Sequence, residues 1–276
     1  MRNNPRLLLA TDLSARCDRA LDRAMLLSRQ LSGSLVAAHV VENRIVNANL
    51  SGDEEIRAAI LDDFPELAGI ERLVIAHGSV PSTIAGLADE LHCDLIITGV
   101  ARYNNLGDFI VGTAVDHLVR QARVPVLVVK RRARHDYQRL LVATDFSSCS
   151  RHALEEAAIL FPTAPIRLVH AYHVPYESWL KSEGVREEIY AETEKELHDF
   201  LAGSNIGTLE GRLETRPVYG ELETVVAQQL RETRSDLLVL GTHGKSGFAY
   251  ATVGSHAADL LASMPCDILM IRETHR

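Results

Sequence analysis

The chain has 276 residues, of which 46% are hydrophobic and 24% are charged, a composition typical of one large or two ordinary soluble domains. A formal net charge of −8 argues against a general nucleic-acid-binding role. The sequence contains no apolar run long enough to span a bilayer, so neither nucleic acid nor a membrane is expected as a partner.

The cysteines and the first residues indicate a cytoplasmic protein with reduced thiols. Cys17, Cys93, Cys149 and Cys266 are scattered and form no C-x-x-C pair, so neither a zinc ribbon nor a redox motif is predicted. The first residues lack the apolar segment of a signal peptide. None of the 12 histidines forms a helical H-x-x-x-H pair, and no metal site is predicted.

The first half of the chain alternates apolar segments with helical patterns. Strands are expected near 6–11, 34–41, 71–77, 94–99 and 125–130. Helices are expected over 15–31, 81–91 and 111–121, with a variable stretch around 50–68. Ser14 lies at an expected helix N-cap.

The second half repeats this order. Strands are expected near 139–144, 165–174, 210–218, 236–241 and 267–272. The long, highly charged stretch 176–202 is interpreted as a solvated helix, and Ser147 lies at an expected helix N-cap.

An internal repeat relates the two halves. The segment Arg6–Ser14, RLLLATDLS, returns as Arg139–Ser147, RLLVATDFS. A period of about 135–140 residues makes each copy a domain, and we place these domains at residues 1–133 and 134–276. The basic run Lys130–Arg134 between the copies is interpreted as a solvated linker.

Alternating strands and helices predict an α/β fold. Each domain is expected to be flavodoxin-like or Rossmann-like, with a five-stranded parallel sheet and helices on both faces. Ligands bind such sheets beyond the carboxyl ends of the strands, where the strand order reverses. If the first and fourth strands are neighbours, Asp145 and Gly241 face each other there.

A glycine-rich segment follows the fourth strand of the second copy. Gly241 and Gly244 end that strand, and Gly254-Ser255 opens the next helical pattern. Glycines let backbone N–H groups approach an anion, and a helix N-terminus adds partial positive charge. The segment therefore suggests a phosphate-binding loop, and the alternative is a plain turn. A P-loop is excluded because Val239 stands where its first glycine belongs.

Over both copies, nearly end to end, the chain resembles a tandem universal stress protein. Members of that family that bind ATP carry Gly-x-x-Gly, nine residues, and then Gly-Ser or Gly-Thr. Gly241-x-x-Gly244, nine residues and Gly254-Ser255 reproduce this spacing. The segment Ala143–Ser147 and His170, at the end of the second strand, complete the match. His170 itself is expected to pack as a strand-end residue.

The resemblance implies an ATP site in the C-terminal copy, with Mg²⁺ arriving on the polyphosphate. Asp145 would hold the ribose hydroxyls, Gly241 would leave room for the ribose, and the backbone of Ala171 would contact the adenine edge. The alternative for Asp145 is a turn or helix-capping role. The phosphates would be bound by the loop and the next helix start, at Thr242, Gly244, Lys245, Ser246, Gly247, Gly254, Ser255 and His256.

The N-terminal copy departs from the pattern. Arg102 stands at the second glycine position, although Asp12 and Gly112-Thr113 remain. Arginine disfavours positive φ, so the backbone cradle is expected to be altered and one nucleotide is predicted per chain. Pairing of Arg102 with a phosphate or another acidic group is the alternative.

These features predict a nucleotide-dependent stress-response or regulatory protein with an unidentified protein partner and no assigned catalytic residue. One alternative is a slow ATPase or phosphotransferase with His243 as the base. Another is a scaffold whose N-terminal copy binds a different ligand. The resemblance further implies that the last strands of the copies pair as an intramolecular pseudo-dimer, and a homodimer of chains stays open.

Overall fold

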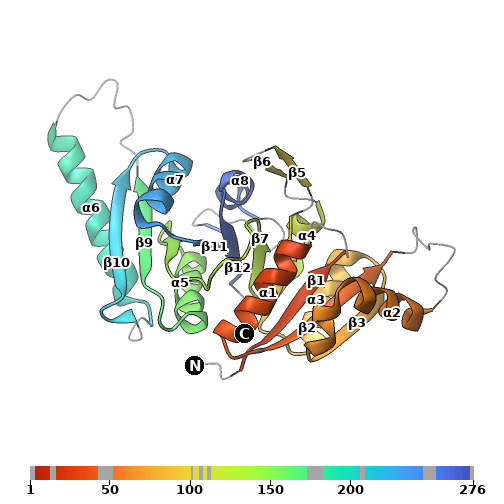
Figure 1. Ribbon diagram of the computed structural model, residues 1–276. Coiled ribbons are helices and arrows are strands. Elements are labelled where there is room, and N and C mark those ends of the chain that lie inside the picture. Colours follow the sequence, from red (N-terminus) through yellow and green to blue (C-terminus); the bar gives the residue numbers. More distant parts are fainter. Residues whose placement is uncertain are drawn as a thin grey trace.

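One continuous sheet runs through the whole protein and is covered by helices on both faces (Figure 1). The computed structural model describes residues 4–12, 17–42, 52–100, 102–105, 108–110, 113–172, 183–205, 209–244 and 253–273.

The N-terminal repeat follows the expected order of elements. Its main strands are β1 (Arg6–Thr11), β2 (Ser34–Val41), β3 (Arg72–His77), β4 (Leu95–Gly99) and β7 (Val126–Val129). Its helices are α1 (Asp18–Gln30), α2 (Asp53–Asp63), the 3-10 helix η1 (Pro65–Gly69), α3 (Val80–Glu90) and α4 (Thr113–Gln121).

The C-terminal repeat has the same order. Its strands are β8 (Leu140–Ala143), β9 (Ile166–Tyr172), β10 (Leu213–Tyr219), β11 (Leu237–Gly241) and β12 (Asp267–Ile271). Its helices are α5 (Ser148–Leu160), α6 (Glu183–Ala202), α7 (Leu222–Thr233) and α8 (Ser255–Ser263).

The strand order within each repeat is third, second, first, fourth, fifth, and all these neighbours are parallel. This is a doubly wound order in which the first and fourth strands are neighbours, so the predicted α/β class is confirmed. The fifth strands, β7 and β12, pair antiparallel and join the two halves into ten strands. The expected pairing of the last strands is therefore present, and the outer edges are β3 and β10.

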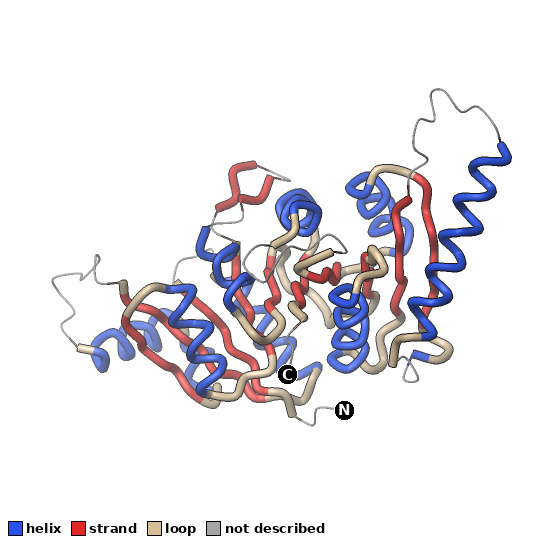
Figure 2. Tube along the Cα trace, turned by 180° about the vertical axis from the view of Figure 1, so that it is seen from behind, coloured by secondary structure: helices blue, strands red, loops and turns tan. Residues whose placement is uncertain are grey.

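Two apolar layers sandwich this sheet because successive strand residues point to opposite faces. Leu7 and Leu9 pack on the face covered by α1, α2, α5 and α6. Leu8 and Ala10 pack on the face covered by α3, α4, α7 and α8. Figure 2 shows helices on both faces of the sheet. Each layer runs across both repeats, so the repeats share one packed structure.

The connection between the repeats corrects one expectation. Arg131, Arg132 and Arg134 are exposed, as a solvated linker requires, but the side chain of Lys130 is 0% exposed. Lys130 follows β7 at the centre of the joined sheet, where the carbonyl groups of Leu261 and Met264 bind its ammonium group. The solvated interpretation is therefore wrong for Lys130.

A short hairpin was not expected from the sequence. Strands β5 (Arg102–Asn105) and β6 (Asp108–Ile110) pair antiparallel between β4 and α4. Strand β6 lies against α8 of the other repeat (Figure 1). The N-terminal repeat thus folds into a hairpin at the place where the C-terminal repeat carries its glycine loop.

Candidate functional site

The candidate site lies where β8 and β11 end side by side. These strands are parallel neighbours, with Leu140 opposite Leu237 and Val142 opposite Val239. Beyond them the chain leads from β8 into α5 on one face of the sheet and from β11 toward α8 on the other. In such a sheet the usual place for a ligand is the crevice beyond the carboxyl ends where the strand order reverses, which here is the place between β8 and β11.

Asp145 follows β8, and its two carboxylate oxygens have different surroundings. Its Oδ1 accepts a hydrogen bond from the Ser147 N–H at 3.1 Å, which is a turn interaction. Ser147 then caps α5, since its Oγ accepts from the Ser150 N–H at 3.2 Å, and the predicted N-cap is confirmed. The alternative turn role of Asp145 is therefore real, and it is made through Oδ1.

The second oxygen of Asp145 lies against Gly244. A Cβ placed on Gly244 would come within 2.5 Å of Asp145 Oδ2, closer than real Cβ contacts allow. A side chain at position 244 would require this half-buried carboxylate or the loop to shift, and Gly244 avoids that shift. Two predicted site residues, one from each strand end, are thus brought into direct proximity.

Gly241 is held close to a different neighbour. A Cβ at this position would lie 3.1 Å from the backbone carbon, the carbonyl oxygen and the Sγ of Cys149. Cys149 belongs to the first turn of α5 and is buried. The glycine at the end of β11 therefore allows α5 to pack against the sheet, a role that the sequence did not suggest.

Thr242 brings the two ends of the glycine loop together. Its N–H donates to the carbonyl of Ile271 at 2.9 Å, and its own carbonyl accepts from the Gly254 N–H at 2.8 Å. The hydroxyl of Thr242 is 2.8 Å from His243 Nδ1, and the side chain is 1% exposed. Residues 245–252, which include the predicted site residues Lys245, Ser246 and Gly247, lie outside the described residues.

The start of α8 offers backbone donors to the crevice. Gly254 is its N-cap, no side chain caps the first turn, and that turn contains no acidic residue. Ser255 and His256 are exposed. The first N–H groups of a helix have no partner within the helix and carry partial positive charge, so this end suits an anion.

Ala171 lies one strand further from the glycine loop, on β9. It is half-buried and pairs with Val218 of β10, whereas the pairing of β9 with β8 ends at Val169. The preceding residue, His170, stacks on Phe146 with ring centroids 4.1 Å apart, and its Nδ1 lies 2.8 Å from the Thr144 carbonyl oxygen. His170 therefore packs as a strand-end residue, as expected.

A separate cavity of about 360 Å³ opens at the opposite end of the same sheet. It is lined at the amino ends of β8, β9 and β10 by residues that include Arg139, Pro165, Arg167, Glu214 and Ser235. Arg167 and Glu214, which are register partners on β9 and β10, form an ion pair in its lining. None of the predicted site residues that the structure describes lines this cavity, so it is distinct from the candidate site.

No described helix combines the length and apolar character needed to cross a membrane. The described residues contain no group of three or more His, Cys, Asp or Glu side chains that could hold a metal ion. All four cysteines are buried and form no disulfide.

Comparison with known proteins gives consistent matches. A universal stress protein of Mycobacterium tuberculosis is 28% identical over 145 residues, covering 50% of this chain and 98% of that protein. A putative universal stress protein of Staphylococcus aureus is 28% identical over 137 residues, covering 45% of this chain and 82% of that protein. Each relative thus matches a length close to one repeat.

Solved structures match the whole chain. A putative universal stress protein from Pseudomonas aeruginosa superposes with a TM-score of 0.69 at 20% identity, covering 98% of this chain and 93% of that one. A universal stress protein from Archaeoglobus fulgidus gives 0.69 at 16% identity, covering 99% and 100%. These likenesses establish the shared tandem fold.

The sequence pattern of the family itself is found twice. The model of the universal stress protein family matches residues 3–130 and again residues 136–272, which together make up nearly the whole chain. This double match agrees with the repeated strand order and with the pairing of β7 and β12. The chain belongs to the universal stress protein family and carries two copies of its fold in tandem.

Proposed function

We propose that the protein binds ATP with Mg²⁺ in its C-terminal repeat, residues 134–276, and acts as a nucleotide-dependent regulatory protein. The N-terminal repeat, residues 1–133, binds no nucleotide in this proposal. ATP serves as a bound ligand that orders the glycine loop and alters a surface for a protein partner, without rapid turnover.

The proximity of Gly244 to Asp145 Oδ2 carries this proposal. A loop backbone held against a carboxylate suits a ligand with both hydroxyl and phosphate groups, because the carboxylate accepts from hydroxyls and the loop N–H groups donate to phosphate. Asp145 would hold the ribose hydroxyls, and the first turn of α8 would bind phosphate through its N–H groups. Mg²⁺ would offset the charge of the polyphosphate.

The remaining predicted residues have supporting roles. Thr242 holds Gly254 beside the end of β11 through the 2.8 Å hydrogen bond, and so fixes both ends of the loop. The backbone of Ala171 would contact the adenine edge, with Gly241 next to the ribose. Lys245, Ser246 and Gly247 would complete the phosphate contacts within the loop.

Equilibrium titration of the full chain with Mg-ATP tests this function. We expect one equivalent of ATP per chain and roughly 10- to 100-fold weaker binding in Asp145→Asn, because the variant loses hydrogen bonds from hydroxyls to a charged acceptor. The variant should also lose most of its preference for ATP over 2′,3′-dideoxy-ATP, which lacks both hydroxyls.

Asp12→Asn provides the matched control, since Asp12 occupies the same place in the N-terminal repeat. This variant should bind one ATP with unchanged affinity. Equal effects of the two substitutions, or no ATP binding by the unaltered protein, would refute the assignment. Release of ADP from a protein that took up ATP would favour the slow ATPase instead.

A further inference from the structure

The end of α8 opposite the proposed phosphate site is held by a residue of the N-terminal repeat. The buried Nζ of Lys130 donates to the carbonyl oxygens of Leu261 at 2.5 Å and Met264 at 2.7 Å. These carbonyls belong to the last turn and C-cap of α8, which is the negative end of the helix dipole. A cation at this position stabilises and orients the helix.

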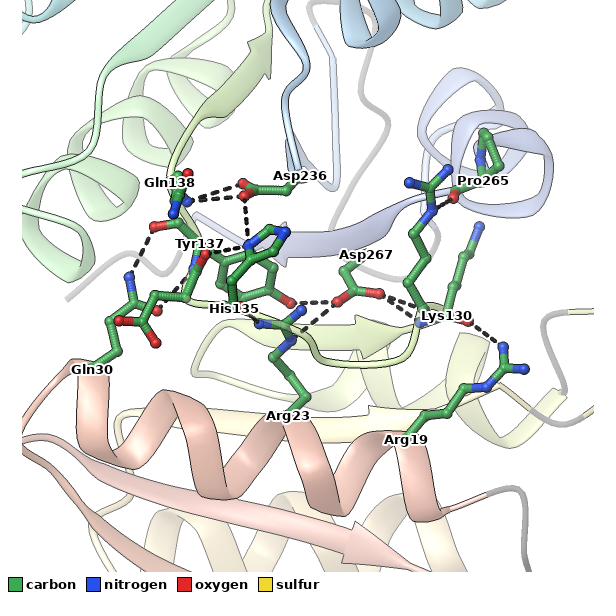
Figure 3. A network of polar contacts seen from close by, with 12 residues as sticks. Arg19, Arg23, Gln30, Lys130, His135, Tyr137, Gln138, Asp236, Pro265 and Asp267 are labelled. Carbon is green, nitrogen blue, oxygen red and sulfur yellow. Dashed lines mark hydrogen bonds and ion pairs between the residues drawn. The ribbon is translucent and has the colours of Figure 1, made fainter.

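Asp267 fixes the backbone from which Lys130 extends. Its Oδ1 accepts from the N–H groups of Lys130 and Arg131, both at 2.8 Å. Its Oδ2 accepts from the Tyr137 hydroxyl at 2.7 Å and lies 3.3 Å from Arg23 Nε (Figure 3). The carboxylate is 1% exposed, so these interactions are shielded from water and salt.

Helix α1 of the N-terminal repeat holds the same connection from the other side. Arg19 donates to the Lys130 carbonyl at 2.8 Å, and Arg23 donates to the His135 carbonyl at 2.9 Å. Gln30 exchanges two hydrogen bonds with the backbone of Tyr137, at 2.9 and 3.1 Å. Lys130 therefore projects from a fixed point of the N-terminal repeat into the C-terminal one.

The location of this ammonium group calls for an explanation. Burial of a charged group is unfavourable, and apolar side chains of similar volume are often as good or better for stability alone. Lys130 nevertheless lies in the interior, bound to the end of a short helix whose start forms the proposed phosphate site. A nine-residue helix moves as a unit, so a contact at its end constrains its start.

We propose that Lys130 is a positioning residue through which the N-terminal repeat sets the phosphate-binding start of α8. This inference rests on the proposed function, because the affected property is the affinity of the C-terminal repeat for ATP. It gives the N-terminal repeat a role that requires no ligand of its own.

The charge of Lys130 supplies a second readout. The titratable groups that act on its charge are Cys266, just before β12, and Asp267, the first residue of β12. Arg19 and Arg23 of α1, with Arg131 and Tyr137 of the connection, contact the Lys130 carbonyl or Asp267. Burial lowers the pKa of Lys130 to about 8, whereas it raises the pKa of Cys266 to about 12 and that of Tyr137 well above its ordinary value. Between pH 7 and 9, Lys130 is therefore the member of these three that changes charge.

Lys130→Met and Lys130→Arg in the full chain test the inference, with Mg-ATP as the probe. Lys195→Met, which removes an exposed lysine of α6, is the matched control. We expect Lys130→Met to bind ATP roughly 5- to 20-fold more weakly near pH 7, a typical coupling between two sites. In the unaltered protein the affinity should fall from pH 7 to 9 with a midpoint near 8 as the helix end loses its cation.

Lys130→Arg keeps its positive charge between pH 7 and 9. Its ATP affinity, whatever its level, should therefore not change with a midpoint near pH 8. The ATP affinity of Lys130→Met should likewise show no change with a midpoint near pH 8. The inference is overturned if Lys130→Met binds ATP like Lys195→Met and keeps the pH profile of the unaltered protein.

Hydrogen exchange separates this inference from the proposed function. If the unaltered protein binds no ATP, the proposed function fails, and the positioning of α8 can still be measured without ligand. Amides of α8 should then exchange faster in Lys130→Met than in Lys195→Met, while those of α4 stay as protected as before. Equal protection of α8 in the two variants would refute the positioning role.

Discussion

The two strand-to-helix connections that follow β4 and β11 have the same spacing in the sequence but carry different residues three positions after the last glycine of the strand. After β11, Gly244 places the loop backbone against the carboxylate of Asp145. After β4, Arg102 begins the short strand β5 of a hairpin. At this position the C-terminal repeat has no side chain beside its acidic strand end, whereas the N-terminal repeat has an arginine.

The two acidic residues differ as well. Asp12 Oδ1 accepts from the buried Sγ of Cys17 at 3.0 Å. Burial, with the Asp12 carboxylate as the next cause, raises the pKa of that thiol to about 12. Asp145 Oδ1 accepts from the Ser147 N–H, and its Oδ2 lies at Gly244, where the N-terminal repeat has Arg102.

The largest effect is expected from Gly254→Val. Gly254 has φ −59° and ψ 147°, which valine also adopts, and an added Cβ would meet the Thr242 carbonyl at an ordinary 3.6 Å. The fold should therefore persist, while the branched side chain covers the first N–H groups of α8. Loss of two charge-assisted hydrogen bonds, about 3 kcal/mol, predicts roughly 100-fold weaker ATP binding by titration.

Gly112→Val makes the corresponding change in the N-terminal repeat and should leave ATP affinity unchanged. A loss of binding in Gly112→Val as large as that in Gly254→Val would break the comparison, because it would place nucleotide in both repeats.

The next largest effect concerns stability and the contact that joins the repeats. The pKa of Lys130 is lowered to about 8 in the folded protein, against about 10.5 in the unfolded chain. Between these values the unfolded chain binds the proton and the folded protein does not, so this group makes the free energy of unfolding rise with pH. Two pH units within this window correspond to about 2–3 kcal/mol.

Urea unfolding near pH 7 and pH 10 measures this effect as the difference between the unaltered protein and Lys130→Met. The buried cysteines titrate in both proteins and cancel in the difference. The free energy of unfolding of the unaltered protein, relative to that of the variant, should rise toward pH 10. If this difference in free energy does not change with pH, the burial of a titratable Lys130 is contradicted.

A smaller loss of stability is expected from Gly241→Ala. The added Cβ would lie 3.1 Å from backbone and Sγ atoms of Cys149, so α5 or β11 must shift slightly. Overpacking of this kind typically destabilises by about 1–3 kcal/mol, which thermal unfolding would detect. An unchanged melting temperature would show that the close approach of α5 does not require this glycine.

The smallest expected effect is the gain of a second, weak ATP site in Arg102→Gly. If the missing glycine is what distinguishes the N-terminal loop, this variant should bind a second, weaker equivalent of ATP in a titration carried to high ligand concentration. If the stoichiometry stays at one, the missing glycine is not what prevents binding in the N-terminal repeat. The hairpin or the Cys17 contact with Asp12 would then be the decisive feature.

Much of the fold could be predicted because its signals are local. Apolar segments ending in Asp, Gly or His marked the strands, and the repeat of RLLLATD as RLLVATD marked the two halves. The neighbouring first and fourth strands follow from the doubly wound order, and with them the proximity of Asp145 to the glycine loop.

The features that were missed depend on contacts between distant residues. A lysine at the head of a basic run looks solvated, yet Lys130 is buried because carbonyls 131 and 134 residues later bind it. A signal was available in Asp267, a charge at the start of an apolar strand where the first copy has Pro125. The packing of Gly241 on Cys149 likewise requires knowledge of the neighbouring helix.

The central claim is that one nucleotide binds per chain and that the C-terminal repeat holds it. The most direct test releases whatever copurifies with the protein by denaturation and identifies and counts it by chromatography and mass spectrometry. The account predicts about one ATP per chain, absent from Gly254→Val and present in Gly112→Val. Two nucleotides per chain, or none together with no binding of added ATP, would contradict it.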